Sequence, residues 1–308
     1  MKDLPDRSIQ CVVTSPPYWG LRNYQVEKQL GLEKTPEEYV EKMVEVFRQV
    51  KRVLKDDGTC WLNLGDSYNG SGGAGGDYNK GGLKDGQPKY KGRNISSLKP
   101  KDLVGIPWRI AFALQADGWW LRQDIVWHKP NPMPESVTDR CTKAHEYIFL
   151  LSKSAKYFYD ADAIKEKASW IEDRPSGMER NAESYRGKVK YNDNNYGGGG
   201  TSFKGHSGNY KANGELINPD GMRNKRSVWS INTKPYAEAH FAVFPPKIPE
   251  LCIKAGTSEG DTVLDPFFGS GTTGWVAQRL GRKWIGIELN PEYIEIAEKR
   301  FIQQDLFV

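Results

Sequence analysis

The sequence has few of the residues that build metal sites, disulfides or membrane anchors. It contains four cysteines and four histidines in 308 residues, and the cysteines stand far apart with no C-x-x-C pair. A zinc site is therefore not indicated, and the thiols are expected to stay reduced, as in a cytoplasmic protein. No charged-then-apolar leader opens the chain, and no apolar run approaches the roughly 20 residues that cross a bilayer. We therefore expect a soluble protein without a membrane partner.

A nucleoside triphosphate loop is also missing, because no G-x-x-x-x-G-K-[ST] motif occurs. A different glycine-rich turn lies near the end of the chain, T-V-L-D-P-F-F-G-S-G-T-T-G-W-V-A at 262–277. Its pattern predicts a strand, a tight turn and a helix, in which glycines let the backbone approach a ligand and the helix start offers unpaired N–H groups. A buried strand is predicted at Lys283–Leu289, where Glu288 at the tip suits the hydroxyls of a ribose.

These features favour a nucleoside ligand over a purely structural turn. The residues D-P-F-F separate the strand from the glycines, and this spacing weakens the interpretation as a nicotinamide dinucleotide site.

A stiff corner is predicted near the start of the chain. The apolar run at 8–14 reads as a strand and continues directly into Ser15-Pro16-Pro17-Tyr18-Trp19. Two prolines fix the backbone dihedrals and remove two N–H donors, so the strand must end and its tip becomes a rigid loop. A merely packed strand exit is the alternative, but the neighbouring hydroxyl and the distant glycine turn favour a functional corner.

Helix and strand patterns alternate between these two motifs. Helices are expected at 35–54, 107–115, 248–255 and 291–303, and strands at 59–64, 119–128 and 145–151, with a short hairpin partner at 157–159.

Positive charge is concentrated in two segments that lack apolar periodicity. Residues 66–104 carry a net charge of +3 and residues 165–226 carry +4, so the remainder of this +5 chain is mildly acidic. Both segments are rich in Gly, Asn, Ser and Tyr. Basic, aromatic-bearing inserts on an acidic scaffold indicate a polyanion-binding surface, with solvated disordered loops as the alternative.

Three motifs in order carry a family resemblance. T-S-P-P-Y-W at 14–19, H-F-A-V-F-P-P at 240–246 and D-P-F-F-G-S-G-T-T-G at 265–274 resemble the beta-class amino-DNA methyltransferases over nearly all of the chain outside the inserts. Membership implies a doubly wound mixed α/β sheet, the S-adenosylmethionine-dependent methyltransferase fold with permuted motif order. It places a catalytic half at 1–164, including the basic insert at 66–104, a target-recognition insert at 165–230 and a cofactor-binding half at 231–308.

The resemblance implies S-adenosyl-L-methionine as the cofactor. The implied cofactor-binding residues are Asp265, Pro266, Phe267, Gly269, Ser270, Gly271, Thr272 and Glu288. Asp265 would lie near the cofactor's ammonium and Glu288 on its ribose. Relatives place a further strand and a Gly-Asp turn, used at the adenine, upstream of the segment matching 1–7. Three explanations stay open: a truncated start, substitution by residues 303–308, or an incomplete adenine pocket. We expect weaker cofactor binding than in a chain extended upstream, a difference that titration of the two would measure.

The chemistry of this family matches the residues of the proline corner. An exocyclic amino group is a poor nucleophile because its lone pair is delocalised into the ring, and acceptors aimed at its hydrogens counter this. Ser15 and the Pro16 carbonyl are the candidate acceptors, held by Pro17, and Tyr18 is expected to stack on a base rotated out of the duplex. Trp19 is expected to support the aromatic wall that Tyr18 forms and to contact DNA. The corner and the glycine turn must then lie side by side.

Double-stranded DNA is the implied substrate. The candidate phosphate and base contacts in the second basic segment are Arg174, Arg180, Arg186, Lys188, Lys190, Arg223, Lys225 and Arg226. Trp127, Lys129, Pro134, His145 and Glu146 resemble the family's middle motifs, and we interpret them as structural residues.

Serine before Pro-Pro resembles the cytosine-N4 enzymes, whereas aspartate or asparagine there more often accompanies adenine-N6 enzymes. We therefore expect a site-specific cytosine-N4 DNA methyltransferase of a restriction-modification system, with a cognate restriction endonuclease as a candidate partner. An adenine-N6 enzyme and a non-catalytic DNA-binding module are the alternatives. Methylation of a ring carbon needs a thiolate after a proline, and none of the four cysteines follows one.

Overall fold

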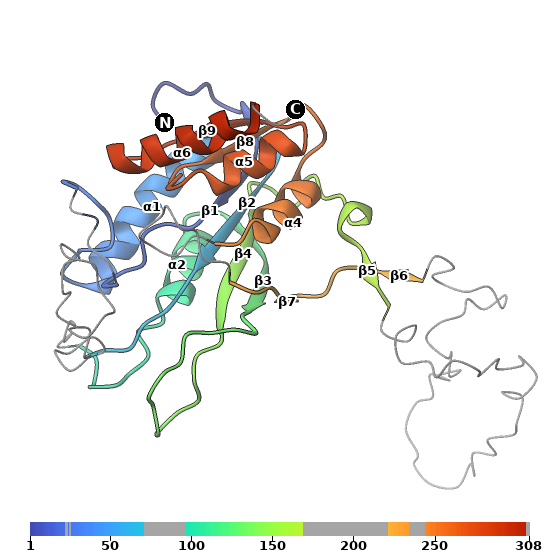
Figure 1. The fold of residues 1–308 in the computed structure, drawn as a ribbon. Helices are drawn as coiled ribbons and strands as arrows, with labels where there is room; N and C mark the ends of the chain where they lie inside the picture. Colours follow the sequence, from blue (N-terminus) through green and yellow to red (C-terminus); the bar gives the residue numbers. More distant parts are fainter. Residues whose placement is uncertain (22–23, 25, 71–96, 169–220, 234–243, 306–308) are drawn as a thin grey trace, which may run out of the picture. The chain divides into compact units, whose positions relative to one another are not determined.

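A computed structural model describes residues 1–21, 24, 26–70, 97–168, 221–233 and 244–305 (Figure 1). The chain divides into two compact units. One comprises Met1–Ala163 with Arg226–Val308, and the other comprises Ile164–Lys225. In the second unit, the described residues include a short antiparallel pair, β5 (Glu166–Lys167) with β6 (Met222–Arg223).

Within the described residues of the first unit, seven strands form one mixed sheet in the order β7-β3-β4-β2-β1-β8-β9. The strands are β1 (Ile9–Thr14), β2 (Leu54–Leu64), β3 (Trp120–His128), β4 (His145–Ser152), β7 (Val228–Ser230), β8 (Thr262–Asp265) and β9 (Lys283–Gly286). Strand β4 pairs antiparallel with both of its neighbours, and every other pair is parallel. Strand β7 begins inside the predicted 165–230 insert and pairs with β3, so the main sheet resumes before residue 230.

Helices cover both faces of this sheet. They are α1 (Pro36–Val53), α2 (Ile106–Ala116), α4 (Lys247–Gly256), α5 (Thr272–Arg279) and α6 (Pro291–Asp305). Helices α1 and α2 pack on the face that carries Leu62 and Phe149, whereas α4 and α5 lie together on the other face (Figure 1). The predicted doubly wound mixed sheet is thus confirmed. Among the described helices, none has the length and apolar character needed to cross a membrane.

Helix α1 shows how local signals set these elements. The Thr35 hydroxyl accepts a hydrogen bond from the Glu38 N–H at 3.2 Å. Pro36 occupies the first turn, where N–H groups have no partner within the helix, so the N–H that proline lacks costs no hydrogen bond. The helix buries Tyr39, Met43 and Phe47 completely on its inner face. Each such side chain contributes roughly 1.5–3 kcal/mol by leaving water, so burial of this face holds the helix on the sheet.

Three predicted elements differ in the structure. Strand β2 starts at Leu54, not residue 59, because α1 ends one residue earlier and Leu54 pairs with Ile9. Residues 157–159 form no strand. One backbone hydrogen bond joins them to the sheet, from the Phe158 N–H to the Asp57 carbonyl at 2.8 Å, and one bond does not make a ladder. The predicted buried strand at 283–289 is a partly exposed edge strand that ends at Gly286.

One buried carboxylate joins the beginning and the end of the chain. Asp265 ends β8 and is 1% exposed. Its Oδ1 accepts the Thr14 hydroxyl at 2.6 Å and the Phe267 N–H at 3.0 Å, and its Oδ2 accepts the Thr273 hydroxyl of α5 at 2.7 Å. Strand β1, strand β8 and helix α5 are therefore fixed around a single side chain.

Burial raises the pKa of Asp265 from its ordinary value of 3.8 to about 6, although three donors contact the carboxylate. Between about pH 4 and 6 the unfolded chain releases this proton while the folded chain keeps it, so the Asp265 contribution to stability falls as pH rises through that window. We expect Asp265→Asn to remove this dependence. The free energy of unfolding of the native protein relative to the variant should fall by up to about 3 kcal/mol across the window.

Urea unfolding at a series of pH values measures this difference. Asp139→Asn is the control, because Asp139 is exposed and its ion pair with Lys101 lowers its pKa. Any pH dependence of stability that comes from Asp139 therefore lies below pH 4. A constant difference between the native protein and Asp265→Asn from pH 4 to 6 would contradict the assignment.

Candidate active site

The carboxyl ends of the parallel strands surround a cavity of about 910 Å³. Because β1, β2, β8 and β9 run in one direction, their ends meet at the same edge of the sheet, together with the amino end of β4. Residues 15–18 after β1 and 266–270 after β8 both line the cavity. The proline corner and the glycine turn therefore share one cleft, as the sequence predicts.

The proline corner is anchored by two hydrogen bonds. The Tyr39 hydroxyl of α1 donates to the Pro17 carbonyl at 2.7 Å, and Trp19 Nε1 donates to the Glu33 carbonyl at 3.1 Å. Trp19 is 3% exposed and belongs to the main core. The prediction that Trp19 contacts DNA is therefore wrong, because the indole is packed beneath the loop. Within the described chain, no donor contacts the Pro16 carbonyl, which stays available beside the cavity.

Tyr18 is held by a polar network at one end of the cavity. Its hydroxyl donates to Glu146 Oε2 at 2.6 Å and lies 3.1 Å from Asn63 Oδ1. Asn63 Nδ2 also donates to Glu146 Oε2 at 3.2 Å, and Lys129 forms an ion pair with Glu146 Oε1. Burial and the neighbouring Glu146 charge raise the pKa of Tyr18 well above 10, so its hydroxyl keeps its proton. Ser15 Oγ lies 3.3 Å from Asn63 Oδ1, which places the serine at the edge of the same network.

Glycine is required next to this tyrosine. A Cβ on Gly65 would lie 2.5 Å from Tyr18 Cε2, closer than a side chain can approach. The next residue, Asp66, accepts the N–H groups of Gly105 at 3.0 Å and Ile106 at 3.1 Å, which start α2. Lys143 Nζ donates to the Asp66 carbonyl at 2.7 Å, and burial lowers the pKa of Lys143. This end of the cavity is thus built from strand ends whose polar groups are mutually paired.

The opposite wall of the cavity is the glycine turn. Gly269 (φ +52°) and Gly271 (φ +78°) adopt left-handed conformations that L side chains rarely take. The Gly269 N–H donates to Glu288 Oε2 at 2.7 Å, and Glu288 Oε1 accepts two further N–H groups, so the carboxylate is fixed at the cavity. Ser270 Oγ is buried and has no hydrogen-bond partner among the described residues. An unpartnered buried hydroxyl in a cavity wall is the kind of group that a bound ligand satisfies.

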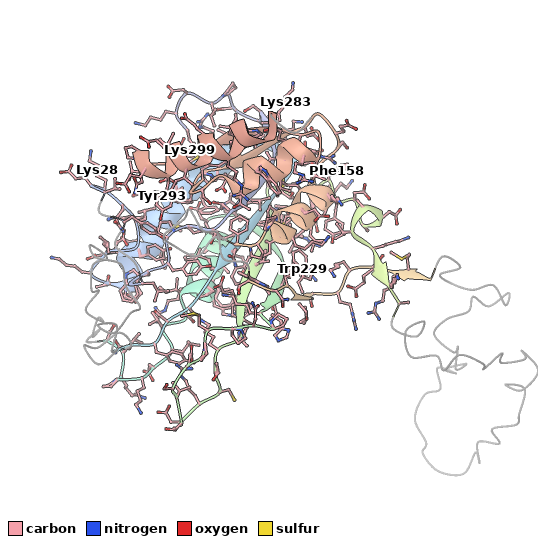
Figure 2. All side chains as sticks on the ribbon, viewed as in Figure 1. Lys28, Phe158, Trp229, Lys283, Tyr293 and Lys299 are labelled. Atoms are coloured by element: carbon pink, nitrogen blue, oxygen red, sulfur yellow. The ribbon has the colours of Figure 1, made fainter. Side chains whose placement is uncertain are left out.

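The cavity rim includes residues from two further segments. Lys28 and Tyr293 both line it, and Figure 2 shows them on the same side of the molecule. The Tyr293 ring of α6 makes an edge contact with Tyr24 at 6.2 Å between centroids. Among the described residues, no group of three or more His, Cys, Asp or Glu side chains is arranged to hold a metal ion.

The predicted site residues fall into distinct groups. Ten of them line the cavity: Ser15, Pro16, Pro17, Tyr18, Pro266, Phe267, Gly269, Ser270, Thr272 and Glu288. Asp265 and Gly271 lie outside the set of lining residues, and Asp265 supports the wall from behind.

The predicted DNA-contacting basic residues are divided between described and undescribed parts of the chain. Arg174, Arg180, Arg186, Lys188 and Lys190 lie outside the described residues. In the second unit, Glu166 forms ion pairs with Arg223 at 3.1 Å and Lys225 at 2.7 Å. Arg226 is exposed, and its carbonyl accepts Trp229 Nε1 at 2.9 Å.

Sequence reasoning missed the residues that organise Tyr18. Asn63 is 3% exposed and stands in the otherwise apolar run C-W-L-N-L, so a polar residue in a core strand was the available signal. The sequence indicates structural roles for Lys129 and Glu146, yet both line the cavity. Their proximity depends on the pairing of β3 with β4, which a linear sequence does not reveal.

Comparisons with known proteins agree with this architecture. The family model described as DNA methylase matches residues 9–299. The chain is 47% identical to the type II methyltransferase M.XycI of Xanthomonas campestris pv. cyanopsidis, covering 99% of this chain and 85% of that protein. It is 45% identical to M.SmaI of Serratia marcescens, covering 99% and 88%. Among solved structures, the PvuII DNA methyltransferase (cytosine-N4-specific) has a TM-score of 0.60 at 21% identity and shares the fold over 97% of this chain and 82% of its own.

The bond between Tyr18 and Glu146 can be tested without any ligand. We expect Tyr18→Phe to lower the free energy of unfolding by about 1–3 kcal/mol, because it removes a hydrogen bond to a charged group. In a Glu146→Gln background the same change should cost clearly less, giving a coupling energy of about 1 kcal/mol or more. Urea unfolding of the four proteins measures the cycle. Tyr157→Phe is the matched control, because it removes an exposed tyrosine hydroxyl that accepts a hydrogen bond from Arg122. Its effect on the free energy of unfolding should be additive with that of Glu146→Gln. Additive effects at Tyr18 would refute the network.

Proposed function

Because this chain belongs to the DNA methylase family, we propose that it is a site-specific DNA methyltransferase that transfers a methyl group from S-adenosyl-L-methionine to N4 of cytosine. The observation that supports this most strongly is the meeting of the proline corner and the glycine turn in one cavity. A donor held at one wall and an acceptor amine held at the other would be brought together without covalent help from the protein.

The glycine-turn wall fits S-adenosylmethionine by its donor and acceptor groups. The Ser270 hydroxyl lacks a partner among the described residues, the Glu288 carboxylate suits ribose hydroxyls, and Phe267 offers an apolar surface. A crystal structure of the Thermus thermophilus protein TTHA0409 contains S-adenosyl-L-methionine, and it shares this fold with a TM-score of 0.55 at 22% identity over 98% of this chain and 89% of that one. When bound, the cofactor supplies an electrophilic methyl group on a sulfonium sulfur.

The proline-corner wall supplies what the amine needs. The Pro16 carbonyl and the Ser15 hydroxyl would accept the two N–H bonds of the exocyclic amino group, which draws its lone pair out of the ring and stabilises the positive charge that develops during attack. Tyr18, fixed by Glu146, would form the aromatic wall for a base rotated out of the duplex. The stiffness of Pro16-Pro17 and the bond from Tyr39 keep both acceptors in place.

Cytosine is favoured over adenine by Ser15, since serine before Pro-Pro resembles the cytosine-N4 enzymes of the family. The PvuII enzyme, which shares the fold, is itself described as cytosine-N4-specific. Adenine-N6 methylation uses the same scaffold and is the alternative.

The segment 165–230 is proposed to read the target sequence, with Arg174, Arg180, Arg186, Lys188, Lys190, Arg223, Lys225 and Arg226 as its phosphate and base contacts. The type II relatives suggest a cognate restriction endonuclease as a partner.

Duplex DNA incubated with the protein and isotope-labelled cofactor, then digested to nucleosides, identifies the base by mass. We expect N4-methylcytosine. N6-methyladenine would replace the cytosine assignment, and unmodified DNA would refute the enzymatic function.

Ser15→Ala should lower the single-turnover rate by roughly 10²-fold or more, because one of two acceptors for the amine is lost. Cofactor affinity should stay within about twofold, since Ser15 belongs to the opposite wall. Rapid-quench methylation and isothermal titration measure the two quantities. An unchanged rate would remove Ser15 from the chemistry.

Ser270→Ala should weaken cofactor binding, whereas Ser15→Ala should leave it nearly unchanged. The ligand-free variant should be as stable as the native protein or slightly more so, because a buried unpartnered hydroxyl contributes nothing to folding. Cofactor affinity should fall by about tenfold, equivalent to one lost hydrogen bond of about 1.4 kcal/mol. Thermal unfolding and titration with S-adenosylmethionine provide the readouts. Ser258→Ala, at an exposed turn remote from the cavity, is the control. Unchanged affinity would show that Ser270 is not a ligand-binding group.

A further inference from the structure

The most exposed large apolar side chain among the described residues lies at the mouth of the cavity. Met133 is 81% exposed, while the other exposed large hydrophobics in the described chain reach at most 57%. It stands in the connection between β3 and β4, which extends beyond the ends of both strands (Figure 1). Met133, Pro132 and Glu135 all line the cavity. One of the residues that line the cavity therefore presents an apolar side chain to solvent.

The connection that carries Met133 is stiff and anchored. Prolines at 130, 132 and 134 fix alternate backbone dihedrals around it. The Asn131 side chain bridges to Thr233, accepting its N–H at 2.9 Å and donating to its carbonyl at 3.2 Å. On the other side, Arg140 pairs with Glu135 at 2.6 Å and lies over the Tyr68 ring at 4.1 Å. These contacts hold the methionine outward, because the short proline segment has little freedom to fold back onto the core.

We propose that Met133 inserts into the DNA duplex and fills the space that the extruded target base leaves. This inference rests on the proposed function. Removing a base from its stack costs a few kcal/mol and opens a gap between the neighbouring base pairs. Apolar side chains, methionine among them, enter unstacked steps elsewhere in protein–DNA recognition. Methionine is unbranched and polarizable, so it can adapt to such a gap whatever bases flank it.

The attachment of this connection to the residues that hold Tyr18 supports this role. Lys129, at the start of the same connection, pairs with Glu146, which in turn holds the Tyr18 hydroxyl. The connection and the aromatic wall are thus parts of one polar framework. The side chain that fills the duplex and the side chain that receives the base would be positioned together.

The test compares duplexes that differ in how easily the target base leaves. Methylation mapping of DNA exposed to the native protein gives the recognition site. Two oligonucleotide duplexes are then made, one with the target base correctly paired and one with it mispaired, since a mispaired base costs less to extrude. Single-turnover methylation is measured for the native protein, Met133→Ala and Met133→Leu, with Leu103→Ala as an exposed apolar control outside the cavity lining.

We expect Met133→Ala to slow methylation of the paired duplex by roughly tenfold, the effect of about 1.4 kcal/mol on the barrier, and to slow the mispaired duplex by about threefold or less. Met133→Leu should retain most activity on both, and Leu103→Ala should match the native protein. Equal losses for Met133→Ala on the two duplexes, or no loss on either, would overturn the proposal. An absence of methylation by the native protein on any DNA would instead refute the proposed function, and the inference with it.

Discussion

The geometry of the site depends on the carboxylate of Asp265. It accepts hydrogen bonds from Thr14 at the end of β1 and from Thr273 at the start of α5. Ser15 follows Thr14 directly, and the cavity-lining turn lies between Asp265 and Thr273, so the two walls are fixed to one buried group. An uncompensated buried carboxylate would be costly, and the three donors around it make the arrangement tolerable only when all elements are in place. The same hydrogen bonds that offset the cost of burying Asp265 therefore fix the separation of the two walls.

The remaining side chains at the site follow from strand direction. Parallel strands deliver their carboxyl ends to one edge, and the antiparallel β4 delivers its amino end there, so Glu146 meets the residues that follow β1 and β2. The two walls have different characters. At the Tyr18 wall the polar groups pair with one another, which fixes the orientation of the ring. At the glycine-turn wall the backbone is open and the Ser270 hydroxyl has no partner in the described chain. In the proposed function, the Tyr18 wall would receive the base and the glycine-turn wall would receive the cofactor.

Much of this could be predicted from sequence, because the two motifs carry strong local signals. Pro16-Pro17 must end a strand, and Gly269 and Gly271 occupy left-handed positions that suit glycine. The resemblance of three motifs to a known family implied the fold class. What sequence could not provide was pairing between distant strands: the partnership of Asn63, Lys129 and Glu146 with Tyr18 depends on β2, β3 and β4 being neighbours. Trp19 was misassigned for a related reason. An aromatic residue in a functional motif can face the ligand or the core. The hydrogen bond from Trp19 Nε1 to the Glu33 carbonyl shows that this indole faces the core.

The proposed chemistry and the proposed reading of DNA are assigned to different parts of this chain. The groups proposed to act on the amine sit on strand ends fixed by prolines, by Tyr39 and by Asp265, since a displacement of even 1 Å would reduce the rate strongly. The segments with the highest positive charge, 66–104 and 165–226, have polar, glycine-rich compositions. In the proposed function, the positive charge of these segments would attract the phosphate backbone of DNA. If the basic segments read the target as proposed, the recognised DNA sequence can change while the groups that follow β1 stay held by Tyr39 and Asp265.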